Sequence, residues 1–209
     1  MFVGGRITEE GIRLACRHGL FPWTGRHPIP WCSPDPRAVL EPDGVVVRRS
    51  LAKRVRSGRY TVRFDQDLPA VIAACRDQQR PGQEGTWITE NLEVAWAGLW
   101  ASGWAHSVEV FEGDERVGGL YGLAMGAAFF GESMFHIRPD ASKVALLALC
   151  RMAATRGDHF IDCQAMTPHL ERMGARPVPR GGYLLRLRRA LEVDRPTESW
   201  SALPCPDLL

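Results

Sequence analysis

The chain reads SVEVFEGDERVGGLYGLAMGAAFFGESM across residues 107–134, and this stretch decides the fold. Its apolar runs are rich in β-branched and aromatic side chains, and the turn-forming residues EGDE interrupt them at 112–115. The pattern predicts strands at 107–111, 117–125 and 127–134. Because the connections between these runs are short, the three strands are expected to form an antiparallel meander.

Elements on either side of the meander predict an α+β fold. Apolar patterns predict helices at 68–76 and 90–102 before it, and a helix at 141–156 and a strand at 160–164 after it. This is the order of acetyltransferase-like folds, so we expect a mixed, largely antiparallel sheet. The other predicted elements are a short helix after Thr8 that ends at Gly19, a loop at 80–85, a short helix at 168–173 and a last strand at 183–187.

Residues 48–63 form a basic segment, with seven Lys and Arg among sixteen residues and no acid. A solvated face would normally intersperse acids, because like charges repel, so the segment favours contact with phosphate groups over a solvated linker. Its surroundings predict strands at 45–47 and 60–64, joined around a turn at residues 57–58. The candidate phosphate-binding side chains are Arg48, Arg49, Lys53, Arg54, Arg56 and Arg59.

The composition is that of an ordinary globular chain. Of the 209 residues, 45% are hydrophobic and 24% are charged, and no apolar run approaches the roughly 20 residues that a membrane helix needs. The first residues lack a signal-peptide pattern and the six cysteines lack zinc-site spacing, so we expect a cytoplasmic protein with reduced thiols. Residues 1–63 carry 12 Lys and Arg against 5 Asp and Glu, whereas the remainder carries 14 against 19, which predicts an anionic partner for the first part.

Two short segments, GESMF at 131–135 and FIDCQ at 160–164, place polar groups in otherwise apolar strands. Side chains alternate along a strand, so Asp162 and Gln164 should project to one face and Cys163 to the other. Burial of a carboxylate is costly unless partners hold it. The residues alone leave two interpretations level: a satisfied polar network inside the core, or a site that orients a nucleophile and its proton.

Acetyltransferase-like folds commonly use CoA as the acyl donor, and the loop before the helix at 141–156 tests whether CoA could bind here. Acyltransferases that use CoA cradle its pyrophosphate with a glycine-rich loop at the start of this helix. Here the loop reads IRPDAS at 137–142 and contains no glycine. The residues therefore predict no CoA site, and the basic segment points to a nucleic acid as the acyl carrier.

Eight short motifs occur in order along the chain. They are GLFPW (19–23), WCSPDPR (31–37), GTWIT (85–89), HSVEV (106–110), GGLYG (118–122), GESMF (131–135), ASK (141–143) and IDCQ (161–164). Together they resemble the leucyl/phenylalanyl-tRNA protein transferase family. The resemblance covers about residues 4–180 and implies a small N-terminal domain attached to a GCN5-like acetyltransferase (GNAT-like) domain.

The resemblance implies transfer of Leu, Phe or Met from aminoacyl-tRNA to proteins that begin with Lys or Arg, which creates an N-degron for protein degradation. It implies a reaction without metal or CoA and without a membrane, and we expect a monomer. By position, Gln164 would hold the attacking amine and help to remove its proton, Asp162 would polarise Gln164 and orient the amine, and Glu132 would contact the aminoacyl end. Tryptophans around the terminal adenosine match Trp23 and Trp87. The side-chain pocket matches Leu120, Phe129, Met134 and Ile161.

Three domain ranges are expected: a small N-terminal domain at 1–58, a GNAT-like catalytic domain at 59–195 and an irregular tail at 196–209. Prolines between residues 28 and 42 predict a rigid, irregular surface. Cys32 stands where the family usually has a second tryptophan.

Two alternatives stay open. A GNAT-like N-acyltransferase with a different acyl donor predicts binding of CoA and no dependence on tRNA. A tRNA-binding module without catalysis predicts that replacement of Asp162 changes nothing measurable.

Overall fold

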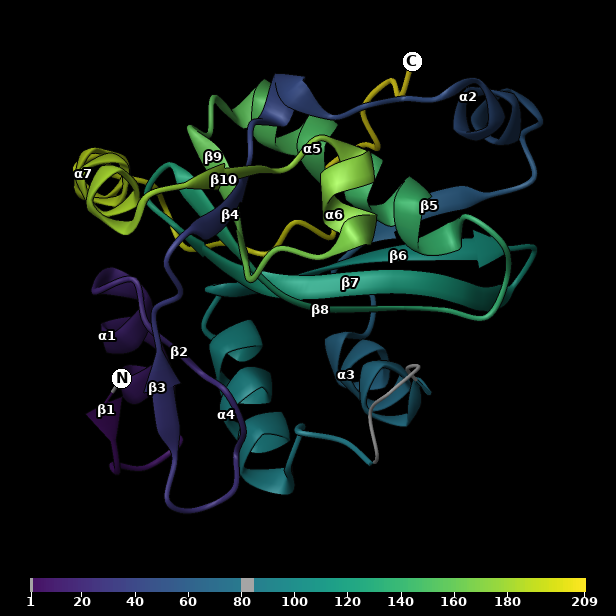
Figure 1. Ribbon diagram of the computed structural model, residues 1–209. Helices are drawn as coiled ribbons and strands as arrows, with labels where there is room; N and C mark the ends of the chain where they lie inside the picture. Colours follow the sequence, from purple (N-terminus) through teal and green to yellow (C-terminus); the bar gives the residue numbers. More distant parts are fainter. Residues whose placement is uncertain (1, 80–84) are drawn as a thin grey trace.

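A seven-stranded mixed sheet forms the centre of the computed structural model, which describes residues 2–79 and 85–209 (Figure 1). Its strand order is β10-β4-β9-β8-β7-β6-β5. Strands β8 and β9 pair in parallel, and the other neighbouring strands described in this sheet pair antiparallel. The strands are β4 (Arg37–Leu40), β5 (Thr61–Phe64), β6 (Ala105–Glu112), β7 (Glu115–Met125), β8 (Ala128–His136), β9 (Phe160–Gln164) and β10 (Arg176–Val178).

The predicted meander is present as β6, β7 and β8, which pair in sequence order. Its two tight turns contain Gly113 and Gly126, whose φ angles of 60° and 58° lie in the left-handed region that favours glycine. At Gly126 a Cβ atom would also lie 2.2 Å from the carbonyl oxygen of Ala190. These turns bring the three strands side by side and confirm the prediction from residues 107–134.

Helices cover both faces of the large sheet (Figure 1). One hydrophobic cluster joins side chains of α1, α3, α4 and α7 to one face, and a second joins α2, α5 and α6 to the other. None of the helices among the described residues is long and apolar enough to cross a membrane. The helices are α1 (Glu9–Arg17), α2 (Arg49–Arg56), α3 (Leu68–Asp77), α4 (Glu90–Ala101), α5 (Ala141–Arg156), α6 (Pro168–Met173) and α7 (Arg180–Leu191), with a 3-10 turn η1 (Pro42–Gly44).

A small sheet lies beside α1 at the N-terminal end, at the lower left of Figure 1. It contains β1 (Phe2–Val3), β3 (Pro30–Cys32) and β2 (Phe21–Pro22), in that order. The proline-rich stretch was predicted to be irregular, and this is wrong for β3 and β4. In β3 the proline, Pro30, is the first residue of the strand, a position where proline is tolerated. β4 contains no proline, because it begins at Arg37, directly after Pro36. The first 58 residues therefore contribute to both sheets.

Two further sequence predictions are wrong. The strand predicted at 45–47 is absent, and residues 49–56 of the basic segment form the helix α2, whose Leu51 and Ala52 are buried. The strand predicted at 60–64 is present as β5. The last predicted strand is the helix α7, in which Tyr183, Leu187 and Ala190 are buried at helical spacing. The loop predicted at 80–85 lies outside the described residues except for its last position. The α+β class with a largely antiparallel mixed sheet is confirmed.

Candidate active site

The site lies where the parallel strands β8 and β9 separate. Their pairing covers three positions and ends at Phe130 and Asp162, whereas β8 continues to His136. A cavity of about 850 Å³ opens beyond this point and is lined by residues from both strands. Separation of two paired strands leaves a gap in the sheet that side chains from both faces can reach, so the cavity extends from the small sheet to α5 and α6.

Each of the two strands carries an extra residue at the cavity. On β8 the partners of Tyr121 and Gly122 are Ser133 and Gly131, so Glu132 is the extra residue of a bulge. On β9 the partners of Ala38 and Val39 are Gln164 and Asp162, which leaves Cys163 as the extra residue. Bulges change the direction of side chains at the point where they occur.

The bulge on β9 ends the predicted alternation of side chains. Cys163 and Gln164 both line the cavity, whereas Asp162 is absent from the described lining. The φ angle of Gln164 is 62°, which is uncommon for a residue with a side chain. The prediction that Asp162 and Gln164 face one side and Cys163 the other is therefore wrong.

Seven of the nine predicted catalytic and substrate-binding residues line this cavity. Apolar and aromatic walls come from the small sheet, the meander and α5, and Glu132 and Gln164 are among the polar residues that lie between them. Phe129 is an exception, because it is fully buried in the core 5.8 Å from the ring of Trp200. The predicted residues that line the cavity are Trp23, Trp87, Leu120, Glu132, Met134, Ile161 and Gln164.

Glu132 and Gln164 form the polar centre of the cavity. Nε2 of Gln164 donates a hydrogen bond to Oε2 of Glu132 over 3.3 Å. Burial raises the pKa of Glu132 to about 8, the hydrogen bond from Gln164 opposes this shift, and the nearby negative charge of Asp162 adds to it. Glu132 is therefore mostly protonated at neutral pH, and the site presents a carboxylic acid beside an amide.

Replacement of Glu132 by glutamine is expected to change how stability depends on pH. The carboxyl group titrates near 4.5 in the unfolded chain and near 8 in the folded one. Between these values the folded state binds more protons, so this group makes the free energy of unfolding fall as pH rises, by about 1.4 kcal/mol per pH unit at most. Melting curves from pH 5 to 8 should show Glu132→Gln becoming more stable relative to the original chain as pH rises. Glu112→Gln, at an exposed ion pair, is the control, and a constant difference across this range would contradict the shifted pKa.

Asp162 is fully buried behind the cavity wall. Its two carboxylate oxygens accept hydrogen bonds from the guanidinium of Arg37, from the hydroxyl of Tyr183 and from the backbone N–H of Gln164. These partners come from three separate elements, namely β4, α7 and β9. Asp162 thus reaches the cavity through the backbone of Gln164.

Cys163 lines the cavity, but its thiol is unsuited to attack as a nucleophile. Burial and the negative charge of Asp162 raise the pKa of Cys163 well above its usual range. A thiol reacts through its thiolate form, which this environment disfavours.

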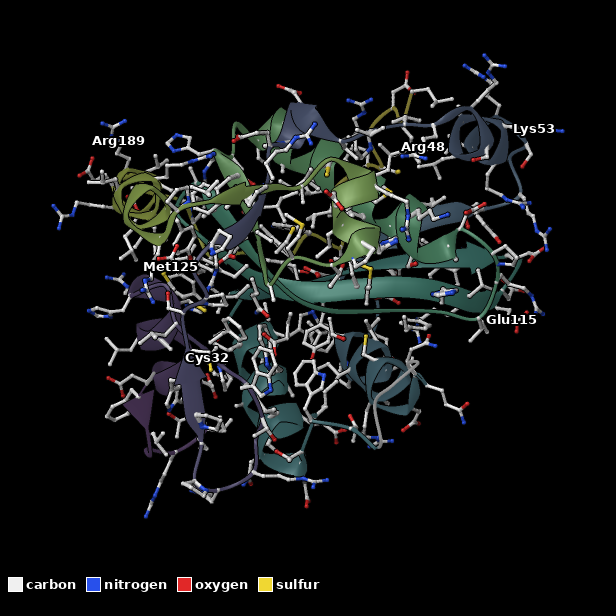
Figure 2. The ribbon with its side chains drawn as sticks, viewed as in Figure 1. Cys32, Arg48, Lys53, Glu115, Met125 and Arg189 are labelled. Atoms are coloured by element: carbon white, nitrogen blue, oxygen red, sulfur yellow. The ribbon has the colours of Figure 1, made fainter. Side chains whose placement is uncertain are left out.

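Of the basic segment, Arg49, Lys53, Arg54 and Arg56 lie on α2, and Arg48 directly precedes this helix. The helix lies away from the small sheet, and Figure 2 shows Arg48 and Lys53 on the side of the molecule opposite Arg189. Arg48, Arg49, Lys53 and Arg56 are exposed. The other two candidates have acidic partners in the described structure. Arg54 lies 3.8 Å from Asp140, and Arg59 makes a bidentate pair with Glu112 at 2.7 and 3.1 Å.

Sequence reasoning missed one wall of the cavity. Arg26 comes from the loop after β2, and Thr167, His169 and Leu170 come from the start of α6. Burial, together with the positive charges of nearby basic side chains, lowers the pKa of His169, so its imidazole is neutral at pH 7. The sequence feature that could have revealed this wall is the short helix predicted at 168–173. It begins only three residues after β9, so the chain must turn back over the end of that strand.

Solved structures with a similar arrangement have little sequence identity to this chain. L-PGS from Bacillus licheniformis matches with a TM-score of 0.48 and 12% identity, and covers 77% of this chain and 66% of its own. A GCN5-related N-acetyltransferase from Kribbella flavida matches with a TM-score of 0.41 and 12% identity, over 80% of this chain and 60% of its own.

Sequence comparison is more specific. The profile of the leucyl/phenylalanyl-tRNA protein transferase family matches residues 39–188. Proteins of that name are 50% identical in Anaeromyxobacter sp. (strain Fw109-5), over 93% of this chain and 83% of the relative, and 49% identical in Chromohalobacter salexigens, over 98% and 80%. The chain therefore belongs to the leucyl/phenylalanyl-tRNA protein transferase family and is an aminoacyltransferase.

Proposed function

We propose that this enzyme moves Leu, Phe or Met from aminoacyl-tRNA to the α-amino group of proteins that begin with Lys or Arg, in the cytoplasm, and so marks them for degradation as N-degrons. The observation that carries the proposal is one cavity that combines aromatic, apolar and polar walls. Trp23, Trp87 and the pair of Glu132 and Gln164 all face it. Family membership supports the coarser statement, transfer from aminoacyl-tRNA to protein.

The apolar part of the cavity suits the side chain of the amino acid. Leu120, Met134, Leu149 and Ile161 supply its walls. An unbranched or γ-branched side chain fits such walls, whereas a β-branched one crowds the entrance. One methyl group changes binding by about 1–3 kcal/mol, so discrimination among amino acids should be graded. Trp23 is 57% exposed and Trp87 is half-buried, which leaves ring surface on which the terminal adenosine can stack.

The polar centre suits attack by an amine on an ester. The amine nitrogen forms a bond to the ester carbonyl carbon, the bond from that carbon to the ribose oxygen breaks, and the proton lost by the amine ends on the ribose oxygen. Because Nε2 of Gln164 donates to Glu132, its side-chain oxygen is the group that can accept a hydrogen bond from the amine. An amide is a weak base, so positioning of the amine supplies more of the rate than proton removal does.

The start of α5 argues against CoA as the donor. In this helix Asp140 precedes the first turn, where a pyrophosphate would have to lie. The carboxylate of Asp140 accepts a hydrogen bond from Lys143 over 2.6 Å and pairs with Arg54. The carboxylate of Asp140 repels a phosphate group, and its pairing with Lys143 and Arg54 leaves these two cations less free to bind one.

A direct assay tests the proposal. Purified protein is mixed with tRNA charged with radiolabelled Leu, Phe or Met and with a peptide that begins with Arg or Lys. Label should pass to these peptides and not to a matched peptide that begins with Ala. In a second reaction, acyl-CoA is supplied in place of the charged tRNA. In a third, the variant Gln164→Ala is used in place of the original chain. Absence of transfer from tRNA, or transfer from acyl-CoA instead, would refute the proposal, and full activity of Gln164→Ala would refute the role of that residue.

The exposed basic side chains of α2 are expected to bind the tRNA backbone. Reversal of Lys53 and Arg56 to Glu should raise the KM for aminoacyl-tRNA about 10-fold or more. It should also flatten the dependence of log KM on log salt concentration, because each phosphate contact contributes roughly 0.7–0.9 to that slope. Both side chains are exposed, so the fold should not change. Steady-state kinetics at several salt concentrations measure both effects.

A matched reversal controls for net charge. Arg188 and Arg189 are exposed on α7, and Figure 2 shows Arg189 at the other end of the molecule from Lys53. Their change to Glu alters the net charge equally. An equal rise of KM in both double variants would show that the effect is general electrostatics and would remove α2 from the tRNA site.

A further inference from the structure

Arg37 is a buried cation that is absent from the described lining of the cavity and takes part in none of the bond changes of the proposed reaction. It begins β4, the neighbour of β9, and is 1% exposed. Nε of Arg37 donates to Oδ1 of Asp162 over 2.8 Å, and Nη2 donates to Oδ2 over 2.7 Å. Such a bidentate pair fixes the plane of the carboxylate as well as its position.

The guanidinium is itself held from three sides. Nη1 of Arg37 donates to the backbone carbonyl of Gly19 over 3.2 Å. Its central carbon lies 5.0 Å from the ring centre of Phe21 and 4.8 Å from that of Tyr183. Contacts between a guanidinium and aromatic faces are attractive, and they restrict its rotation. Arg37 therefore presents Asp162 with a fixed donor pair.

Asp162 passes this order to Gln164. Oδ1 accepts the backbone N–H of Gln164 over 2.9 Å, and Oδ2 accepts the hydroxyl of Tyr183 over 2.7 Å. The φ angle of Gln164 is 62°, a conformation that costs about 1 kcal/mol or more for a residue with a side chain and persists only where its surroundings enforce it. The hydrogen bond to Asp162 and the pairing of Gln164 with Ala38 on β4 hold this backbone. In this conformation the Gln164 side chain reaches Glu132.

We propose that Arg37 is a positioning residue for the transfer reaction, which acts through the carboxylate of Asp162 to hold the backbone, and hence the side-chain amide, of Gln164 in the cavity. This inference rests on the proposed function of Gln164. It also defines the role of Asp162, which orients Gln164 through the backbone N–H and does not contact the substrate.

The test separates positioning from stability with two variants. Arg37→Met leaves the buried carboxylate of Asp162 without its cation, so stability falls. In Arg37→Met/Asp162→Leu both charges are replaced by apolar groups of similar size, which is often neutral or stabilising relative to a broken pair. We expect the double variant to melt at a higher temperature than the single one. Its kcat for transfer of Phe to an Arg-first peptide should nevertheless stay at least 10-fold below that of the original chain, with KM for Phe-tRNA changed less than threefold.

Matched variants and a second measurement complete the test. Arg116→Lys weakens another pair with a buried acid, Glu109, on β6 and β7, and should lower stability without lowering kcat. Tyr183→Phe keeps the ring and removes one hydrogen bond to Asp162, so its kcat should fall only a few-fold. Hydrogen exchange of the Gln164 backbone amide, followed by NMR, should be at least 10-fold faster in the double variant.

The possible outcomes are distinct. A kcat that recovers together with stability in the double variant would overturn the positioning role and make Arg37 purely structural. Unchanged amide exchange at Gln164 would overturn the route through the backbone. If the original chain transfers no amino acid, the proposed function fails, while the exchange measurement still tests whether Arg37 and Asp162 hold Gln164.

Discussion

Replacement of Asp162 by alanine is expected to lower the free energy of unfolding by about 3–5 kcal/mol, because it leaves the guanidinium of Arg37 buried without a counter-charge. Arg37 is 1% exposed and Asp162 is fully buried, so water cannot replace the lost carboxylate. The backbone N–H of Gln164 and the hydroxyl of Tyr183 lose their acceptor at the same time. Urea titration at pH 7 measures the change. Under conditions where the variant is still folded, its kcat should also be far below that of the original chain.

The same experiment on an exposed pair is the control. Glu112 pairs with Arg59 at 2.7 Å, with side chains that are 33% and 40% exposed. Exposed ion pairs contribute about 1 kcal/mol or less, so Glu112→Ala should have a small effect. If Asp162→Ala cost no more than Glu112→Ala, the buried network would not stabilise the fold. If its kcat were unchanged, Asp162 would have no role in the transfer reaction.

Replacement of Trp200 by alanine is the second large expected effect. Trp200 is 1% exposed, although it belongs to the tail at 196–209, in which the structure shows no helix or strand. Its ring stacks on His106 with centres 3.8 Å apart and contacts Phe64 edge to face at 6.3 Å. Its backbone N–H donates to Asp65 over 2.7 Å. Loss of a buried tryptophan typically costs about 3–5 kcal/mol, and chemical unfolding should show a loss in this range.

Trp23 supplies a matched tryptophan. It is 57% exposed, so Trp23→Ala should leave the unfolding free energy nearly unchanged and instead weaken binding of aminoacyl-tRNA. Trp200→Ala should show the reverse pattern, a large loss of stability with binding preserved below the melting temperature. A loss below about 1 kcal/mol for Trp200→Ala would show that the tail is not part of the folded core.

Elements with a strong local pattern were predictable from the sequence. The helix at 141–156, the strand at 160–164 and the short helix at 168–173 have the predicted bounds. Each of them has local signals: α5 is a long apolar run that ends at Gly157, β9 is a short apolar run, and α6 begins with Pro168 after the cap Thr167 and ends before Gly174. Neighbouring residues therefore carry the information. The basic helix α2 and the helix α7 were misjudged, because charged residues outnumber the few buried positions that reveal a helical period.

The cavity was predictable in its residues and not in its geometry. The motifs named Glu132 and Gln164, and the structure brings them within hydrogen-bond distance. Two bulges, with Glu132 and Cys163 as the extra residues, decide which side chains face the cavity. A bulge depends on how two strands pair, and the strand that pairs with β9 on one side, β4, lies more than 100 residues earlier in the chain. Alternation within a single strand cannot reveal it.

The sequence by itself determined the α+β class, the meander, the basic segment and the family, because these depend on periodicity, charge and ordered motifs within short windows. The tertiary structure alone decided that Asp162 lies behind the cavity wall, that Arg37 and Tyr183 hold it, and that Trp200 completes the core. These contacts join residues between 21 and 125 positions apart, or bring an irregular tail against the sheet. The physical reason is that a buried charge or ring is stabilised by whatever surrounds it in space, and only the packing of distant segments supplies those surroundings.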